Sequence, residues 1–133
     1  MGADACPFFN VGFPGKGGLM KKENRLRRRS DFAWVYRRGK SYANKYLVIY
    51  VTPNGQNLNR FGFSVGKRLG KAVKRNRIRR RLRELCRLHL GELKKGYDIV
   101  VIPRNPAPEA DHDTLRRALR HLFHKANIFG NSY

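Results

Sequence analysis

The chain has 133 residues, which suffices for one domain with one hydrophobic core and is short for two. Its 30 Lys and Arg against 9 Asp and Glu give a formal net charge of +21. The positive charges repel one another, and a bound polyanion relieves this repulsion, so nucleic acid is the favoured partner. No apolar run approaches the roughly 18 residues of a spanning helix, which leaves a peripheral basic helix as the only membrane alternative.

The N-terminal segment is rich in glycine, contains two prolines and lacks the continuous apolar core of a secretory signal. We expect residues 1–19 to be a disordered extension and residues 20–133 to form a single domain, with Met20 as an alternative start. Cys6 and Cys86 are far apart and form no CxxC pair. This predicts two reduced thiols and a cytoplasmic protein.

The first ordered element is predicted to be a short helix with the sequence SDFAWVYRRG. Ser30 is placed to cap its N-terminus and Gly39 to end it. Three of its larger side chains are spaced to share one face of the helix: Phe32, Val35 and Tyr36.

Two β-strands are predicted next, over residues 46–52 and 60–66, and a brief strand at 41–43 can precede them. The segment PNGQNLN between the two supplies turn residues that bring the chain back. Alternation places six apolar residues toward the core: Leu47, Ile49, Val51, Phe61, Phe63 and Val65. Tyr50 and Ser64 fall on the opposite face, which is open to a ligand or to a covering helix.

A strongly basic helix is predicted from Ala72 or Val73 to Leu90, with Gly91 ending it. Its apolar stripe comprises Ile78, Leu82, Leu85 and either Leu88 or His89. Ten Lys or Arg occur from Lys67 onward before the first acid, Glu84. A solvated helix face normally intersperses acids with bases, so this pattern predicts guanidinium rows that bind phosphates. Those rows are Arg75, Arg79 and Arg83, and beside them Asn76, Arg80, Arg83 and Arg87.

The C-terminal part is predicted to contain one interior strand and one amphipathic helix. The run YDIVVIP over residues 97–103 is apolar on both faces, as an interior strand requires. The last helix has an apolar stripe of Leu115, Leu119, Leu122, Phe123 and Ala126. The predicted order is therefore helix, two or three strands, helix, strand, helix, an α+β fold with a small sheet packed by helices in a two-layer sandwich.

Catalysis by the protein alone is not expected, and no catalytic or metal-binding residue is assigned. The acids are scattered, and Asp111 and Asp113 suit the start of a helix better than a metal site. His121 and His124 have a spacing that permits metal binding, but no third ligand is near in the sequence.

The stretch FSVGKRLGKAVKRNRIRRRLRE resembles the signature of the protein subunit of bacterial ribonuclease P, with the triplet Arg75-Asn76-Arg77 at its centre. The flanking segments RLRRRSDFAWVYRRGKSYANKYLVIY and YDIVVIPRNPA extend the resemblance over residues 22–126. Gly66, Arg68 and Arg79 depart from the residues usual in that family. Gly66 lacks the hydroxyl group that is usual there in that family, so no side-chain contact is expected at this position.

The resemblance implies a protein that assists a catalytic RNA in the Mg²⁺-dependent endonucleolytic removal of the 5′ leader from precursor tRNA. It implies the ribonuclease P RNA and precursor tRNA as partners, no obligate protein partner, and no cofactor bound by the protein itself, since the Mg²⁺ serves the RNA. It also implies a sheet with a left-handed β-α-β crossover, contrary to the usual handedness.

The resemblance further assigns binding residues by position. Binding of the RNA subunit is implied for Lys67, Arg68, Lys71, Arg75, Asn76 and Arg77. Binding of the leader is implied for Phe32, Tyr36, Tyr50, Ser64, Arg79, Arg80 and Arg83. The alternative is a ribosomal or other structural RNA-binding protein without a role in cleavage. Charge alone does not separate the two, but the long signature and the aromatic face favour the first.

Overall fold

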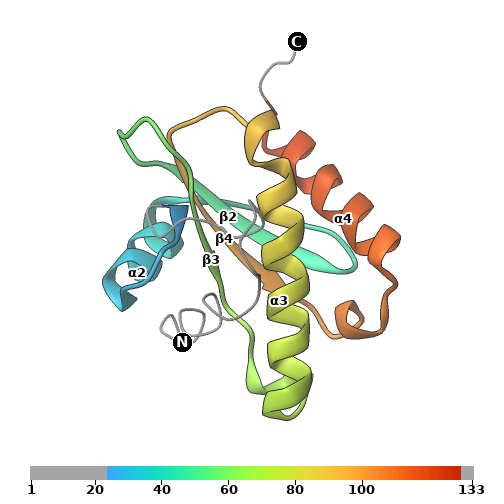
Figure 1. Cartoon of the computed structure of the whole chain (residues 1–133). Helices are drawn as coiled ribbons and strands as arrows, with labels where there is room; N and C mark the ends of the chain where they lie inside the picture. The colour runs from blue at the N-terminus through green and yellow to red at the C-terminus, as the bar shows by residue number, and fades with distance from the viewer. Residues whose placement is uncertain (1–23, 130–133) are drawn as a thin grey trace, which may run out of the picture.

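The structure, a computed structural model, describes residues 24–129. The predicted extension over residues 1–19 lies outside this range. The described chain forms helices and strands in the order expected from the sequence (Figure 1). They are α2 (Arg29–Arg38), β1 (Lys40–Ala43), β2 (Leu47–Pro53), β3 (Arg60–Phe63), α3 (Ala72–His89), β4 (Tyr97–Pro103) and α4 (His112–Lys125).

The four strands form one mixed sheet in the order β1-β2-β4-β3. β2 pairs antiparallel with both β1 and β4, whereas β3 pairs parallel with β4. The two strands flanking PNGQNLN are therefore not neighbours, because β4 lies between them. The apolar faces of β4 explain this placement, since a strand in the centre of the sheet has both of its faces buried. The left-handed sense of the β3-α3-β4 crossover stays a prediction.

Helices cover both faces of the sheet. The larger core lies between one face and the helices α3 and α4, and it contains the six predicted inward residues of β2 and the β3 segment. A smaller core on the other face packs α2 against the sheet through Leu26, Phe32, Val35 and Val100. The structure therefore has three layers where two were expected, because α2 covers the sheet face that was predicted to be open.

The ends of several elements differ from the predicted ones. Arg28 occupies the N-cap of α2 without a side-chain hydrogen bond, and Ser30 lies within the helix. β3 ends at Phe63, although the Ser64 amide still donates to the Val101 carbonyl at 3.0 Å. Gly91 lies inside a 3-10 turn, η4 (Leu90–Glu92), that continues α3.

The start of α4 matches its prediction, because Asp111 caps the helix and its carboxylate accepts from the Thr114 amide at 3.0 Å. Within the described residues no helix is long and apolar enough to cross a membrane.

His89 is the buried residue at the end of the α3 stripe, and Leu88 is exposed. The ring nitrogen Nδ1 lies 2.7 Å from the Leu85 carbonyl, and the ring packs edge-on to Phe123 and Phe129. Burial lowers the pKa of His89, despite opposing effects of the Leu85 hydrogen bond and Glu92; the positive charges of Arg120 and Arg116 lower it further.

Acid should therefore destabilise the fold through His89. The unfolded chain takes up the proton near pH 6.5 and the folded chain only at lower pH, so the free energy of unfolding falls with acid by at most about 1.4 kcal/mol per pH unit. Urea unfolding between pH 7.5 and 5 measures this slope. The His89→Leu variant should reduce it, whereas the exposed His112→Gln should not; equal slopes in all three proteins would contradict the assignment.

Candidate nucleic-acid interface

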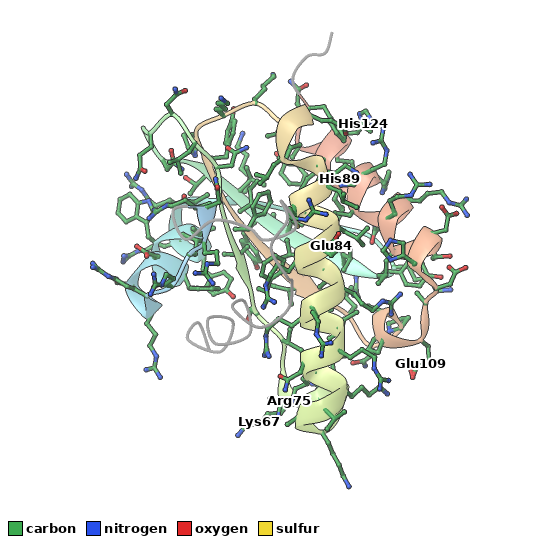
Figure 2. All side chains as sticks on the ribbon, viewed as in Figure 1. Lys67, Arg75, Glu84, His89, Glu109 and His124 are labelled. Carbon is green, nitrogen blue, oxygen red and sulfur yellow. The ribbon has the colours of Figure 1, made fainter. Side chains whose placement is uncertain are left out.

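The start of α3 presents a cluster of exposed basic side chains. Lys67 and Arg68 lie in a 3-10 turn, η3 (Lys67–Leu69), and Lys71 is the N-cap residue of α3; all three are exposed. Figure 2 shows Lys67 and Arg75 at this end of the helix. The first turn of α3 has no acidic residue. Its free backbone N–H groups and these cations together favour an anion.

The three residues of the central triplet have different surroundings. The Arg75 Nε donates to the Gly70 carbonyl at 3.0 Å, and Gly70 has a φ of 129°, which favours glycine. The side-chain Oδ1 of Asn76 accepts from the Arg79 guanidinium at 2.9 Å. Arg77 is exposed. Arg75 and Asn76 thus order the turn and a neighbouring side chain, and Arg77 is available to a ligand.

Two of the predicted guanidiniums do not project into solvent. Arg79 is 3% exposed and Arg83 is 1% exposed, whereas Arg80 is exposed. The expectation of open arginine rows along the helix is therefore wrong at these two positions. The buried side of α3 extends beyond its apolar stripe, so periodicity alone misplaced them.

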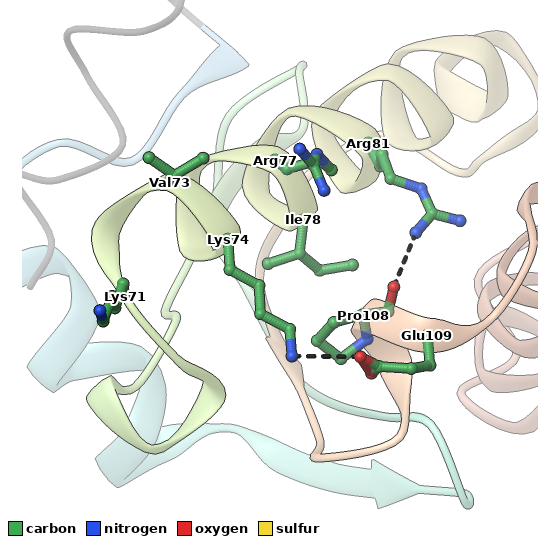
Figure 3. Close-up of a pocket in the computed structure, with 8 residues that line it drawn as sticks. All are labelled: Lys71, Val73, Lys74, Arg77, Ile78, Arg81, Pro108 and Glu109. Atoms are coloured by element: carbon green, nitrogen blue, oxygen red, sulfur yellow. Dashed lines mark hydrogen bonds and ion pairs between the residues drawn. The ribbon is translucent and has the colours of Figure 1, made fainter.

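A groove runs between α3 and the 3-10 turn η5 (Ala107–Glu109), as Figure 3 shows. Its volume is about 340 Å³, and it is lined by Lys71, Val73, Lys74, Arg77, Ile78, Arg81, Pro108 and Glu109. The Lys74 ammonium lies 3.1 Å from the Glu109 carboxylate, and Arg81 donates to the Ala110 carbonyl at 2.7 Å. The sequence did not predict this groove, because η5 comes from a loop that no local pattern relates to α3.

Three predicted leader-binding residues come together on the α2 side of the sheet. The rings of Tyr36 and Tyr50 meet edge-to-face, with centroids 5.1 Å apart and planes at 83°. The Tyr36 hydroxyl hydrogen-bonds to Ser64. Burial and the neighbouring Tyr50 raise the pKa of Tyr36 above its usual value, although the bond to Ser64 opposes this. The cluster Tyr36–Tyr50–Ser64 is half-buried, so its rings remain partly accessible.

Phe32 belongs to the smaller core, against which Tyr36 and Tyr50 pack. Its side chain is 3% exposed, so its ring packs in the smaller core and offers no free face for a base; the leader binding implied for it stays a prediction. Gly62 is what allows the ring to lie on the sheet, since a Cβ there would come within 2.5 Å of it. Gly62 lies two residues before Ser64 and so shares its face by alternation, but the sequence pattern did not reveal this close contact with Phe32.

Side chains that could bind a metal are dispersed among the described residues. None of their His, Cys, Asp and Glu side chains gather in a group of three or more that could hold a metal ion. Cys86 is a buried free thiol whose pKa is raised by burial. The arrangement supplies exposed cations on α3 and half-buried tyrosines on the other side of the sheet, which suit phosphates and unpaired bases respectively.

Comparison with known proteins identifies the family. The family model described as Ribonuclease P matches residues 20–127. The chain is 49% identical over 109 residues to the ribonuclease P protein component of Clostridium botulinum, covering 81% of this chain and 98% of the relative. It is 44% identical over 113 residues to that of Alkaliphilus oremlandii, covering 85% and 99%.

Solved structures agree with this match. The RNase P protein of Staphylococcus aureus superposes with a TM-score of 0.74 at 35% identity, covering 80% of this chain and 98% of that one. The RNase P protein of Thermotoga maritima gives 0.71 at 40% identity, covering 76% and 96%. The exposed cations of α3 and the tyrosine cluster thus occur in a chain that belongs to the family of bacterial ribonuclease P protein components.

Proposed function

We propose that this chain is the protein subunit of ribonuclease P, and that it binds both the catalytic RNA and the 5′ leader of precursor tRNA. The observation that carries the proposal is the pairing of two surfaces. One is the exposed basic start of α3, and the other is the cluster Tyr36–Tyr50–Ser64 on the opposite side of the sheet.

The start of α3 is proposed to contact the RNA subunit. Lys67, Arg68, Lys71 and Arg77 would neutralise phosphates directly, since their charges are exposed. Arg75 and Asn76 would act mainly by ordering this surface, through Gly70 and Arg79.

The leader is proposed to lie along the tyrosine cluster. Unpaired bases stack on aromatic rings regardless of their identity, which suits a leader of variable sequence. Arg80 would contact the leader phosphates, because it is exposed. Arg79 and Arg83 would add positive charge from within the fold, and Phe32 would hold α2 on the sheet.

We propose that the RNA subunit, which requires Mg²⁺, catalyses the bond cleavage. The protein's contribution is then to bind and orient the leader and to lower the repulsion between two polyanions. A cytoplasmic location follows from this role and stays a prediction.

Reconstitution tests the proposal. The purified chain should increase cleavage of precursor tRNA by a bacterial ribonuclease P RNA at low Mg²⁺ and should show no cleavage without that RNA. Gel analysis of 5′-labelled substrate measures both. Absence of stimulation by folded protein would reject the proposal in favour of a structural RNA-binding protein.

The triplet should account for part of the salt dependence of RNA binding. In Arg75→Ala/Arg77→Ala, the slope of log affinity against log salt should become shallower by about 0.7 to 0.9 for each phosphate that is no longer neutralised. Filter binding to the RNA subunit at several salt concentrations measures it. The exposed pair Lys94→Ala/Lys95→Ala removes equal charge and serves as the control. Identical slopes in the two double variants would exclude a specific phosphate role for the triplet.

A further inference from the structure

A second basic hollow lies away from the surfaces described above. It is formed between the turn that joins β1 to β2 and the outer side of α4, and we call it the hairpin hollow. Its volume is about 420 Å³, and it is lined by Asn44, Lys45, Tyr46, Thr114, Arg117, Ala118 and His121. It lies at the β1 edge of the sheet, whereas β3 forms the other edge. Figure 1 shows α4 and α2 on opposite sides of the molecule.

Asn44 holds the hairpin hollow in a defined shape. Its Oδ1 accepts from the amides of Tyr46 and Leu47, each at 3.0 Å, which identifies Nδ2 as the donor. Nδ2 lies 3.0 Å from the Ala118 carbonyl and 3.2 Å from Nδ1 of His121. His121 Nδ1 must therefore accept, so the neutral ring carries its proton on Nε2. The fixed amide thus selects the histidine tautomer that offers a donor on the ring side away from Asn44.

The acceptors of the turn beside the hollow are already occupied. The Asn44 carbonyl accepts from Arg104 at 3.0 Å, and the Ala43 carbonyl lies 3.5 Å from the Lys125 ammonium. The nearby carboxylate of Asp113 binds Arg116 at 2.6 Å and Arg117 at 2.9 Å. A ligand therefore meets mainly donors, which favours an anion.

Donors and an aromatic ring line the hollow together. Lys45 and Arg117 are exposed cations, and Thr114 adds a hydroxyl group. The Lys45 ammonium lies 5.4 Å from the ring centroid of Tyr46, so cation and ring are next to each other. A nucleotide presents the matching pair of groups, a phosphate with a base attached through the sugar.

We propose that the hairpin hollow binds a backbone phosphate, with its nucleotide against Tyr46, from a second segment of the catalytic RNA. The inference rests on the proposed function. The RNA subunit is favoured over the substrate because the proposed leader site lies on the α2 face, while α4 packs on the opposite face. The proposed RNA-subunit surface on α3 and the hollow on α4 belong to helices that pack on the same face of the sheet, so one folded RNA on that side can contact both.

The test compares two double variants that remove the same charge. Lys45→Gln/Arg117→Gln changes the hollow, and Lys94→Gln/Lys95→Gln changes exposed lysines in the turn before β4. The full chain is titrated with ribonuclease P RNA alone, and the reconstituted holoenzyme is titrated with precursor tRNA. We expect the first variant to bind the RNA subunit about tenfold more weakly than the second, with a salt slope shallower by about 0.7 to 0.9, as one phosphate is no longer neutralised. Both variants should keep the wild-type melting temperature.

A third variant, His121→Glu, places a carboxylate in the hollow at an exposed helix position and should weaken RNA binding in the same way. Equal RNA affinity and slope in the two double variants would overturn the inference, while wild-type stimulation of cleavage would leave the proposed function standing. A decrease in precursor tRNA affinity alone would show that the hollow serves the substrate and would also overturn it. Failure of the wild-type chain to bind the RNA subunit would reject both proposals together.

Discussion

Replacing Asp98 by Ala should lower the free energy of unfolding by about 2 kcal/mol, since it removes a buried acceptor of three hydrogen bonds and leaves the partly exposed Arg60 guanidinium without its counter-charge. Asp98 is 2% exposed. One carboxylate oxygen accepts from the Arg60 Nε at 2.8 Å and from Asn54 at 2.9 Å, and the other accepts from the Arg60 Nη2 at 2.7 Å. The same hydrogen bonds raise the pKa of Arg60. Asp98 therefore joins β4, β3 and the loop after β2.

Urea unfolding followed by circular dichroism measures this decrease in stability. Asp113→Ala is the matched control, because this carboxylate also binds two arginines but does so in solvent, and it should change stability little. Asp98→Asn should be intermediate, since it keeps the size and part of the hydrogen bonding. If Asp98→Ala were as stable as Asp113→Ala, the network would not stabilise the fold.

The central strand and the helices could be predicted from the sequence because their patterns are local. The run YDIVVIP needs no partner to show that both of its faces are apolar, and the structure places it between β2 and β3. What the sequence could not show was that this strand separates β2 from β3. A turn of Asn and Gly shows that the chain reverses, but pairing depends on which later strand buries more surface between them.

The candidate site could also be predicted only in part. Strand alternation placed Tyr50 and Ser64 on one face, and the structure brings both to Tyr36. The burial of Arg79 and Arg83 was not predictable, because helical periodicity gives angles around an axis and not how far neighbouring segments extend over it. The role of Asn44 was also hidden, since its partners Ala118 and His121 lie more than 70 residues away.

Replacing Tyr50 by Ala should weaken binding of precursor tRNA by the holoenzyme by about 2 kcal/mol, roughly thirtyfold, while leaving mature tRNA binding unchanged. The ring of Tyr50 meets that of Tyr36 at 5.1 Å, so its removal takes away one stacking surface and the support of the other. Tyr50→Phe keeps the ring and should retain most of the affinity. Equilibrium binding with substrates that do and do not carry a leader measures the difference.

A leader-specific decrease in affinity is the signature that separates base stacking from a structural role. Tyr97→Ala provides the matched control, because Tyr97 is also a half-buried tyrosine in a strand but packs against the other core. A general decrease in stability in either variant would weaken precursor and mature tRNA binding alike, since both depend on a folded protein in the holoenzyme. Two outcomes would contradict the leader site. One is an equal loss of affinity for precursor and mature tRNA in Tyr50→Ala, and the other is the same ratio of the two affinities in Tyr50→Ala and Tyr97→Ala. Either would mean that the tyrosine cluster is part of the core and that the leader binds elsewhere.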